Sequence, residues 1–352
     1  MNGKMKAVLK KNLLPGLNVE EIPIPEIGEG EVLIKVRAAG ICGSDVHMFE
    51  GADSYKVFEK FMPLVMGHEF CGDVCDVGSA VKAVRPGDRV VSRVAASCGD
   101  CRYCRSDRMH FCSVAFTRIL GLQKNGGFAE YVAVSEESCI LLPDAIGYEL
   151  GALIEPLGVT GNAVNDSGLT LGETVVIQGP GPIGLLTLLH AKARGAGKCI
   201  VVGTKNDSFR LRKAKEFDAD HIVVADEEDP VNAVRELTGG YGADVVFEAS
   251  GVPQLLQTAL DMCDKTGRVV VEGIYGSPGT IDFTPMVRSA KKLLGTYGGP
   301  IAWDRMIAWL SADSRYAKLP LSVITHRSKL EDAEAAFKRS VKKENIKELF
   351  IL

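Results

Sequence analysis

A glycine-rich turn between an apolar run and a helical pattern restricts the fold of this chain more than any other feature. The segment "TVVIQGPGPIGLLTLLHAK" places Gly179, Gly181 and Gly184 in G-x-G-x-x-G spacing, after a strand-like run and at the start of a helix. In that context the first glycine permits a tight turn, the second lets a pyrophosphate approach the backbone, and the third lets the helix pack closely on the strand. We therefore predict a dinucleotide site at this turn, which includes Pro182 and Ile183, with the free N–H groups and the dipole of the helix available to the phosphates.

Short apolar runs alternate with helical patterns from about residue 155 to about residue 296. The runs are "ETVVIQG", "KCIVVG", "HIVVA", "DVVFEAS", "RVVVEG" and "KLLGTYG", and the helical segments include "GLLTLLHAKARG" and "SFRLRKAKEF". This alternation indicates buried parallel strands in a doubly wound α/β (Rossmann) domain, which we place at 157–296. So many further strands disfavour the alternative that the glycine-rich turn binds nothing.

The remainder of the chain has a different pattern. The first 155 residues consist mostly of short strands and turns, such as "EVLIKVRAAG", "GDRVVSRVAA" and "GGFAEYVAV". The tail "LEDAEAAFKRSVKKENIKELFIL" reads as an amphipathic helix followed by one strand, which we expect to rejoin the first domain. A chain of 352 residues is long enough for about two domains. The predicted fold class is α/β, with a second, mostly-β domain made of 1–156 and 297–352.

Composition and charge exclude several classes of protein. The chain is 46% hydrophobic and 24% charged, and its formal net charge of −4 gives no attraction to nucleic acid or to an anionic membrane. No signal peptide and no run of 18 apolar residues is evident, so the cytoplasm is the expected compartment. In a reducing compartment, closely spaced cysteines bind metal more often than they form disulfides.

The end of the second predicted strand bears on the choice between NAD and NADP. An acidic residue about 20 positions after the glycines would accept the ribose hydroxyls of NAD. The strand instead ends at Gly203, followed by Thr204 and Lys205, which would accept a 2′-phosphate. We therefore favour NADP slightly over NAD; the alternative is that Asp207 reaches back to the ribose.

Four cysteines lie within fifteen residues of the first domain. Cys98, Cys101, Cys104 and Cys112 have the spacing C-x₂-C-x₂-C-x₇-C. Four thiolates in a tetrahedral array form a closed structural zinc site with no open position for chemistry. A disulfide knot is disfavoured in a reducing compartment, and a nucleic-acid-binding finger is disfavoured because no aromatic platform or wider basic face accompanies the local arginines.

A second group of potential metal ligands is spread over three segments. The segments "AGICGSDVH", "MGHEFCG" and "LIEPLGV" contain thiol, imidazole and carboxyl groups, the ligand types of a catalytic zinc that keeps one position open. Each segment alone is weak evidence, but the set is much more specific beside a dinucleotide fold. The residues are Cys42, Ser44, His47, His68, Glu69 and Glu155.

Together these motifs resemble a known family. "GICGSDVH", "GHEF", the cysteine lobe, "EP" at 155–156 and "GPGPIG", in this order, resemble the zinc-dependent medium-chain dehydrogenases, most closely the sorbitol, polyol and threonine dehydrogenase branch. The resemblance covers essentially the whole chain. It implies a GroES-like catalytic domain interrupted by a Rossmann domain, one catalytic and one structural zinc per chain, and a homo-oligomer, either a tetramer or a dimer.

The resemblance also implies roles for the second group. Residues that match Cys42, His68 and Glu69 hold the catalytic zinc, and Glu155 approaches it directly or through water; which glutamate completes the zinc shell stays open. The zinc would lower the pKa of a substrate hydroxyl, Ser44 would take its proton, and His47 would pass the proton to solvent. Hydride transfer to the nicotinamide would then give a ketone.

The implied substrate is a secondary alcohol, a polyol or sugar alcohol that may carry a phosphate. "SRVAAS" lacks the Glu-Pro of many polyol members, and "GTYGG" at 295–299 lacks their substrate-binding arginine. An L-threonine 3-dehydrogenase-like amino-alcohol dehydrogenase is therefore a second reading. A catalytically silent cofactor-binding protein on the same fold is a third, although a complete ligand set disfavours it.

Overall fold

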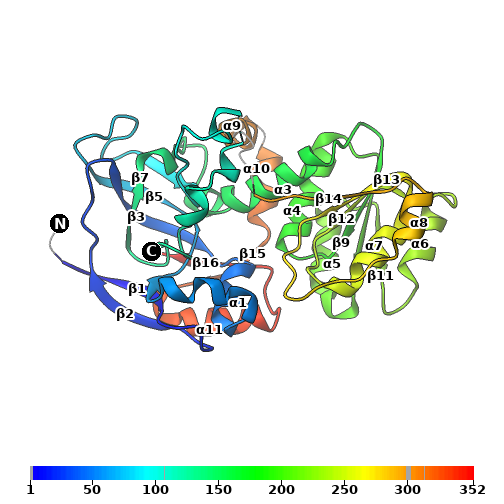
Figure 1. Cartoon of the computed structure of the whole chain (residues 1–352), viewed down its shortest axis with the longest axis horizontal. Coiled ribbons are helices and arrows are strands. Elements are labelled where there is room, and N and C mark those ends of the chain that lie inside the picture. Colours follow the sequence, from blue (N-terminus) through cyan, green and yellow to red (C-terminus); the bar gives the residue numbers. More distant parts are fainter. Residues whose placement is uncertain (1–2, 107, 299–302, 313) are drawn as a thin grey trace. The chain divides into compact units, whose positions relative to one another are not determined.

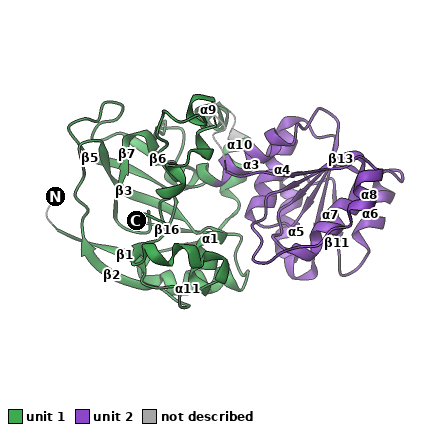
Figure 2. Ribbon diagram, in the orientation of Figure 1, with its two compact units in different colours: residues 1–155, 299–352 green, residues 156–298 purple. Residues whose placement is uncertain are grey.

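The strands of this chain form two kinds of sheet, and each kind belongs to its own unit. The computed structural model describes residues 3–106, 108–298, 303–312 and 314–352; Gly299, the last residue of the "GTYGG" segment, lies outside these ranges. Unit 1 contains Met1–Glu155 and Gly299–Leu352, and unit 2 contains Pro156–Gly298 (Figure 2). The boundary at Glu155 falls in the first turn of helix α3 (Ile154–Asp166).

Unit 2 is built on a parallel sheet in which every pair of neighbouring strands is parallel. Its strand order is β11-β10-β9-β12-β13-β14, which is the 3-2-1-4-5-6 order of a Rossmann fold when the strands are counted along the chain. The strands are β9 (Thr174–Gln178), β10 (Lys198–Gly203), β11 (His221–Val224), β12 (Ala243–Glu248), β13 (Cys263–Val271) and β14 (Lys292–Gly295).

Helices alternate with these strands along the chain, as the sequence predicted (Figure 1). After α3 they are α4 (Pro182–Arg194), α5 (Ser208–Glu216), α6 (Pro230–Leu237), α7 (Leu256–Met262) and α8 (Phe283–Arg288). Central strands such as β9 and β12 are apolar and fully buried at Val176 and Val246, because a parallel sheet is covered on both faces. The order of the strands reverses between β9 and β12, and ligands of such sheets bind at the carboxyl ends of the strands at this point.

Unit 1 is mostly β-structure. Strands β2-β1-β4 form a three-stranded sheet, and a seven-stranded sheet has the order β15-β16-β3-β5-β6-β8, with β7 also paired to β3. The strands are β1 (Lys4–Lys10), β2 (Asn18–Pro23), β3 (Glu31–Gly40), β4 (Leu64–Val65), β5 (Glu69–Val77), β6 (Arg89–Ser92), β7 (Tyr131–Ser135), β8 (Cys139–Leu141), β15 (Ile324–Ser328) and β16 (Lys347–Ile351). The helices are α1 (Gly43–Glu50), α2 (Tyr148–Ala152), α9 (Trp303–Ala312), α10 (Ser314–Leu321) and α11 (Ala333–Val341).

The C-terminal tail completes the large sheet of unit 1. Strand β16 pairs antiparallel with β3, with Leu349 opposite Gly40, and parallel with β15. The tail therefore contributes its last strand beside the strand that leads into α1, as the sequence predicted.

Helix α1 is an element that the sequence analysis did not predict. It has only eight residues, and its apolar positions do not form a strong helical pattern. It is held instead by tertiary contacts: the ring of Phe49 lies 5.2 Å from the ring of Phe337 in α11, and Phe337 also meets Phe128 edge-on. All three rings are buried, so the position of α1 depends on this aromatic cluster.

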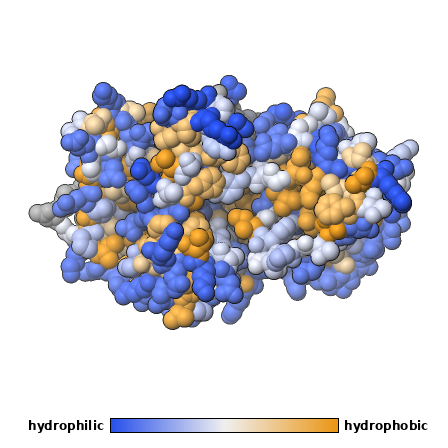
Figure 3. All heavy atoms as spheres, viewed as in Figure 1, coloured by the Kyte–Doolittle hydropathy of each residue, from blue (hydrophilic) through white to orange (hydrophobic). Residues whose placement is uncertain are grey.

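Apolar side chains are exposed among hydrophilic ones on the face of each unit that Figure 3 shows. None of the helices within the described residues has both the length and the apolar character needed to cross a bilayer.

The aromatic cluster leads to a stability prediction. Replacing Phe337, which is completely buried, by alanine should lower the free energy of unfolding by about 3–5 kcal/mol, because it removes a ring and leaves a cavity. Phe209→Ala is the control, since that ring is 45% exposed and should cost about 1 kcal/mol or less. Urea denaturation followed by fluorescence measures both; equal losses would contradict the packing described above.

Candidate active site and metal centres

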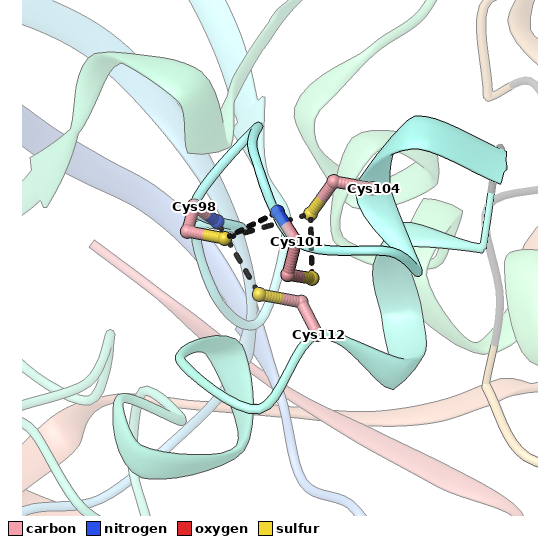
Figure 4. Close-up of side chains that lie close together, drawn as sticks. All are labelled: Cys98, Cys101, Cys104 and Cys112. Carbon is pink, nitrogen blue, oxygen red and sulfur yellow. Dashed lines mark hydrogen bonds between the residues drawn. The ribbon is translucent and has the colours of Figure 1, made fainter.

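The four clustered cysteines converge on a single point in unit 1 (Figure 4). The sulfur of each lies within 4.8 Å of the other three; Cys101 and Cys104 are 3.5 Å apart, and Cys98 and Cys104 are 3.9 Å apart. None of the four forms a disulfide. Cys104 and Cys112 are buried, while the loop around Cys98 is exposed.

Backbone N–H groups face these sulfurs and favour their charged form. The N–H of Cys98 donates to the sulfur of Cys112, and the N–H of Cys101 donates to the sulfur of Cys98. Burial opposes ionisation of Cys112, but the backbone donors of Cys98 and Ala115 outweigh it and lower the pKa of its thiol to about 6. Four convergent sulfurs with amide donors are suited to a tetrahedral metal ion, and the set has no open position for a substrate.

A second cluster of potential ligands lies where α1, β5 and the loop before β5 meet in unit 1. One ligand atom each of Cys42, His68 and Glu69 lies within 4.8 Å of the others. His68 and Glu69 are buried. Glu155 is not part of this set, but its charge acts on both His68 and Lys347.

The position of Cys42 is fixed by the start of helix α1. It is the N-cap residue; its N–H donates to the carboxylate of Asp45 at 2.9 Å, and its own side chain accepts from the backbone at Asp45. This reciprocal arrangement is a capping box in which a cysteine stands in place of serine or threonine. Capping thus orients the thiol toward the ligand cluster.

The carboxylate of Asp45 also lies beside the imidazole of His68. Its second carboxylate oxygen lies 3.7 Å from Nδ1 of His68, and Asp45 is completely buried. Neither of these two atoms has a hydrogen-bond partner among the described residues. A carboxylate behind a histidine fixes the ring so that its other nitrogen faces a metal.

Lys347 contributes the buried positive charge of the cluster. Its ammonium pairs with the carboxylate of Glu69 and donates to the carbonyl of Ile41 at 2.9 Å. Burial acts to lower the pKa of Lys347, but Glu69 and then Cys42 outweigh it, so its pKa lies above the usual value. Lys347 therefore stays charged.

Even with Lys347, acidic groups exceed basic ones in this buried space. The thiol of Cys42 and the carboxyls of Asp45, Glu69 and Glu155 face one ammonium and one imidazole. Burial, and then the charge of Glu69, raise the pKa of Glu155 to about 7. Burial opposes protonation of His68, yet Asp45 and Cys42 raise its pKa well above the usual value. A divalent cation would neutralise this excess, so the residues fit a metal site.

Ser44 and His47 lie one helical turn apart on α1. Residues three apart lie on one side of a helix, and Ser44 follows Cys42 by two positions. The ring of His47 is stacked on Tyr55, with 5.6 Å between the ring centroids. Both side chains are partly exposed, which suits groups that exchange protons with solvent.

The glycine-rich turn of unit 2 has the geometry that the sequence predicted. Gly179 follows β9 with φ of +107°, and a Cβ there would lie 2.8 Å from the N of Ser250. A Cβ on Gly184 would lie 1.9 Å from the carbonyl oxygen of Gly179. Nothing among the described residues lies within 4 Å of a Cβ built on Gly181, the N-cap of α4. Protein packing therefore explains Gly179 and Gly184, whereas Gly181 leaves space for a ligand.

The loop after β10 contains Thr204, Lys205 and Asp207, the residues on which the predicted choice between NADP and NAD depends. The strand ends at Gly203, where a Cβ would meet Pro180 at 2.9 Å, so this glycine also has a packing role. Asp207 is turned inward: its carboxylate accepts from the N–H of Thr204 at 3.1 Å and from its hydroxyl at 2.7 Å. The Lys205 side chain is 62% exposed, and Glu227 lies 3.7 Å from its ammonium.

Asp45 and Lys347 are functional candidates that the sequence analysis missed. The C-x-x-D spacing at Cys42–Asp45 is a local capping signal and was readable in principle. A lysine in the apolar run "IKELFIL" is also unusual, but nothing local says which carboxylate it meets, because Glu69 lies far away in the sequence.

The glycines allow stability and cofactor binding to be separated. Gly184→Ala should destabilise unit 2 by about 2 kcal/mol or more, because its Cβ meets backbone. Gly181→Ala should leave the melting temperature unchanged and weaken dinucleotide binding about tenfold, because its Cβ would occupy the space of the pyrophosphate. Calorimetric titration and thermal melts measure both effects; unchanged dinucleotide binding by Gly181→Ala would contradict the assignment.

The two ligand clusters predict two bound metal ions, each of which should be lost when a ligand of its own cluster is replaced. Cys101→Ser should remove about one of about two zinc ions per chain, and His68→Ala should remove the other. Cys75→Ser is the control, because Cys75 belongs to neither cluster. Metal analysis by mass spectrometry measures the content; a Cys101→Ser protein that keeps both ions would refute the lobe as a metal site.

Comparison with known proteins agrees with both parts of the chain. The family model "alcohol dehydrogenase GroES-like domain" matches residues 28–144, and the model "zinc-binding dehydrogenase" matches residues 182–312. The chain is 36% identical over 337 residues to a sorbitol dehydrogenase of Halalkalibacterium halodurans, with 95% of each protein covered. It is 37% identical over 341 residues to an L-threonine 3-dehydrogenase of Chelativorans, with 96% of each covered.

Solved structures show the same similarity. A zinc-binding dehydrogenase of Sinorhizobium meliloti, solved bound to NADP, has a TM-score of 0.87 and 30% identity, with 99% of this chain and 100% of that chain covered. A structure titled as a short chain alcohol dehydrogenase, from Escherichia coli and complexed with NADH, has a TM-score of 0.88 and 28% identity, with 99% of each covered. The matched models and the full-length relatives place this chain in the zinc-dependent medium-chain dehydrogenase family, as an enzyme of the alcohol dehydrogenase type.

Proposed function

We propose that this chain is a zinc-dependent dehydrogenase that transfers a hydride between a secondary alcohol and NADP, reversibly giving the ketone. The observation that carries the proposal is the buried cluster of Cys42, His68 and Glu69 beside the helix that bears Ser44 and His47. A silent binding protein would not need to keep this ligand set together with an excess of buried acidic groups.

Cys42, His68 and Glu69 would hold the catalytic zinc, with Glu155 as a carboxylate that approaches the same ion. When bound, a zinc ion supplies a Lewis acid that lowers the pKa of an alcohol hydroxyl. The lobe of Cys98, Cys101, Cys104 and Cys112 would hold a second, structural zinc; this makes one catalytic and one structural ion per chain.

Ser44 and His47 would carry the proton that the alcohol releases. The hydroxyl of Ser44 would accept it, and the partly exposed imidazole of His47 would pass it to solvent. Their position one turn apart on α1 supports this relay. Asp45 and Lys347 would hold the ligands His68 and Glu69 in place.

Gly179, Gly181, Pro182, Ile183 and Gly184 would bind the pyrophosphate at the start of α4. Gly203, Thr204 and Lys205 would contact the adenosine ribose, and the exposed ammonium of Lys205 favours the 2′-phosphate of NADP. The inward-turned carboxylate of Asp207 supports this preference, because it is engaged with Thr204.

This assignment predicts a switch in cofactor preference. Lys205→Asp should weaken NADPH binding about tenfold or more, because a cation that contacts the phosphate is replaced by a repelling carboxylate, while NADH binding stays equal or improves. Lys265→Asp is the control, because it makes the same charge change near the amino end of β13, whereas the predicted cofactor site is at the carboxyl ends of the strands. It should alter the binding of neither NADPH nor NADH. Fluorescence titration with each cofactor measures these affinities. Tighter binding of NADH than of NADPH by the unmodified protein would overturn the NADP assignment.

The proposed substrate is a polyol or sugar alcohol, with or without a phosphate, since a sorbitol dehydrogenase is among the full-length relatives. An L-threonine 3-dehydrogenase-like activity is the second candidate, supported by a relative of equal similarity. We further propose a cytoplasmic homo-oligomer, a tetramer or dimer, with small-molecule substrates as its partners.

A substrate panel tests the proposed function. Polyols, sugar-alcohol phosphates, 2,3-butanediol and L-threonine are offered with NADP and NAD, and reduced nicotinamide is followed by absorbance. Ser44→Ala should lower kcat about 100-fold on the best substrate, because it interrupts the proton relay, whereas Ser79→Ala, at an exposed turn, should not. No turnover of any alcohol with either cofactor would refute the proposal.

A further inference from the structure

A groove in unit 1 is lined by residues other than those assigned to the zinc and cofactor sites. It encloses about 820 Å³ between the segment around β8 and helix α9. None of its lining residues belongs to either ligand cluster. Its size falls in the range of small-molecule sites, which are mostly apolar and carry few polar groups.

The walls of the groove are apolar. Ile140 and Leu141 of β8 form one side. Within the described part of the chain β8 lies at the edge of its sheet, beside β6, and Leu141 is 54% exposed. Ile307, Ala308 and Ala312 form the other side, on one face of α9. The small side chains of the two alanines project little from this face of the helix, so they leave the groove open.

Arg93 is a cation that lines this apolar groove and has no hydrogen-bond or ion-pair partner among the described residues. Arg93, directly after β6, lines the groove and is only partly exposed. Within the described residues its guanidinium makes no hydrogen bond and no ion pair, although its backbone N–H donates to the carbonyl of Ser138. By contrast, the similarly enclosed guanidinium of Arg268 binds both carboxylate oxygens of Glu173.

A guanidinium in this state is costly unless a ligand satisfies it. Burial lowers the pKa of Arg93, and Asp304 on the groove offsets this only in part. Because Arg93 is only partly buried, water can reach its guanidinium, and a carboxylate would replace that water at donors that no described protein group satisfies. The planar fork of arginine matches a carboxylate with two parallel hydrogen bonds.

We propose that this groove binds a small amphipathic carboxylate, with its carboxylate on Arg93 and its hydrocarbon part between β8 and α9. The negative charge of Asp304 at the same groove disfavours a more highly charged anion such as a phosphate dianion. The apolar walls select against small hydrophilic carboxylates. This site goes beyond the proposed dehydrogenase activity and does not depend on it.

Octanoate is the probe, titrated calorimetrically into the purified full-length protein. Octanamide has the same chain without the charge and should bind at least about tenfold more weakly. Arg93→Gln should weaken octanoate binding at least about tenfold. It should keep or raise the melting temperature, because the guanidinium has no partner in the protein to lose. Arg85→Gln removes an 87% exposed arginine nearby and should bind octanoate within about twofold of the unmodified protein.

Ala308→Trp provides a second, charge-neutral test, since it fills the groove and should abolish binding of both probes. Octanoate held at the zinc cluster would be insensitive to Arg93→Gln, and that result would overturn the proposal. Equal affinity for octanamide would also overturn it, because the charge would then have no role. A third outcome is that octanoate does not bind and that Ala308→Trp changes the oligomeric state seen in sedimentation. This outcome would overturn the proposal and show that this face is a contact between copies of the chain.

Discussion

The structure of unit 1 is organised around an excess of buried acidic groups over basic ones. Cys42, Asp45, Glu69 and Glu155 face a single buried ammonium, that of Lys347, and one imidazole. Charges of one sign are not buried together unless cations compensate them. A bound divalent ion would provide the compensating charge, and the same charge would help an alcohol to lose its proton near neutral pH. Stability and chemistry therefore depend on one electrostatic requirement.

Distant parts of the chain meet to build this cluster. Cys42 and Asp45 come from the start of α1, His68 and Glu69 from the start of β5, and Lys347 from the last strand, β16. Strand β3 links them, since it pairs with both β5 and β16 and runs directly into α1. The aromatic contact between Phe49 and Phe337 holds α1 from the other side. The C-terminal strand is thus part of the active-site construction, in addition to closing the sheet.

Local features of the sequence predict local features of the structure well. The parallel strands and the glycine turn follow from short-range patterns, and the steric roles of Gly179 and Gly184 match their predicted ones. The association of Cys42 with His68 and Glu69 rested on a family resemblance, because no spacing rule joins them. The ion pair of Lys347 with Glu69 and the place of Arg93 in its groove depend on tertiary packing. Sequence periodicity carries no information about such contacts.

The most direct test of the account is the dependence of alcohol oxidation on the metal of the Cys42–His68–Glu69 cluster. The rate on the best substrate is measured before and after chelation and again after zinc is restored, while cofactor binding is followed in parallel. The account predicts that oxidation is lost on chelation and recovers with zinc, whereas nicotinamide binding to unit 2 persists throughout. Undiminished oxidation by protein shown to be free of metal would contradict it.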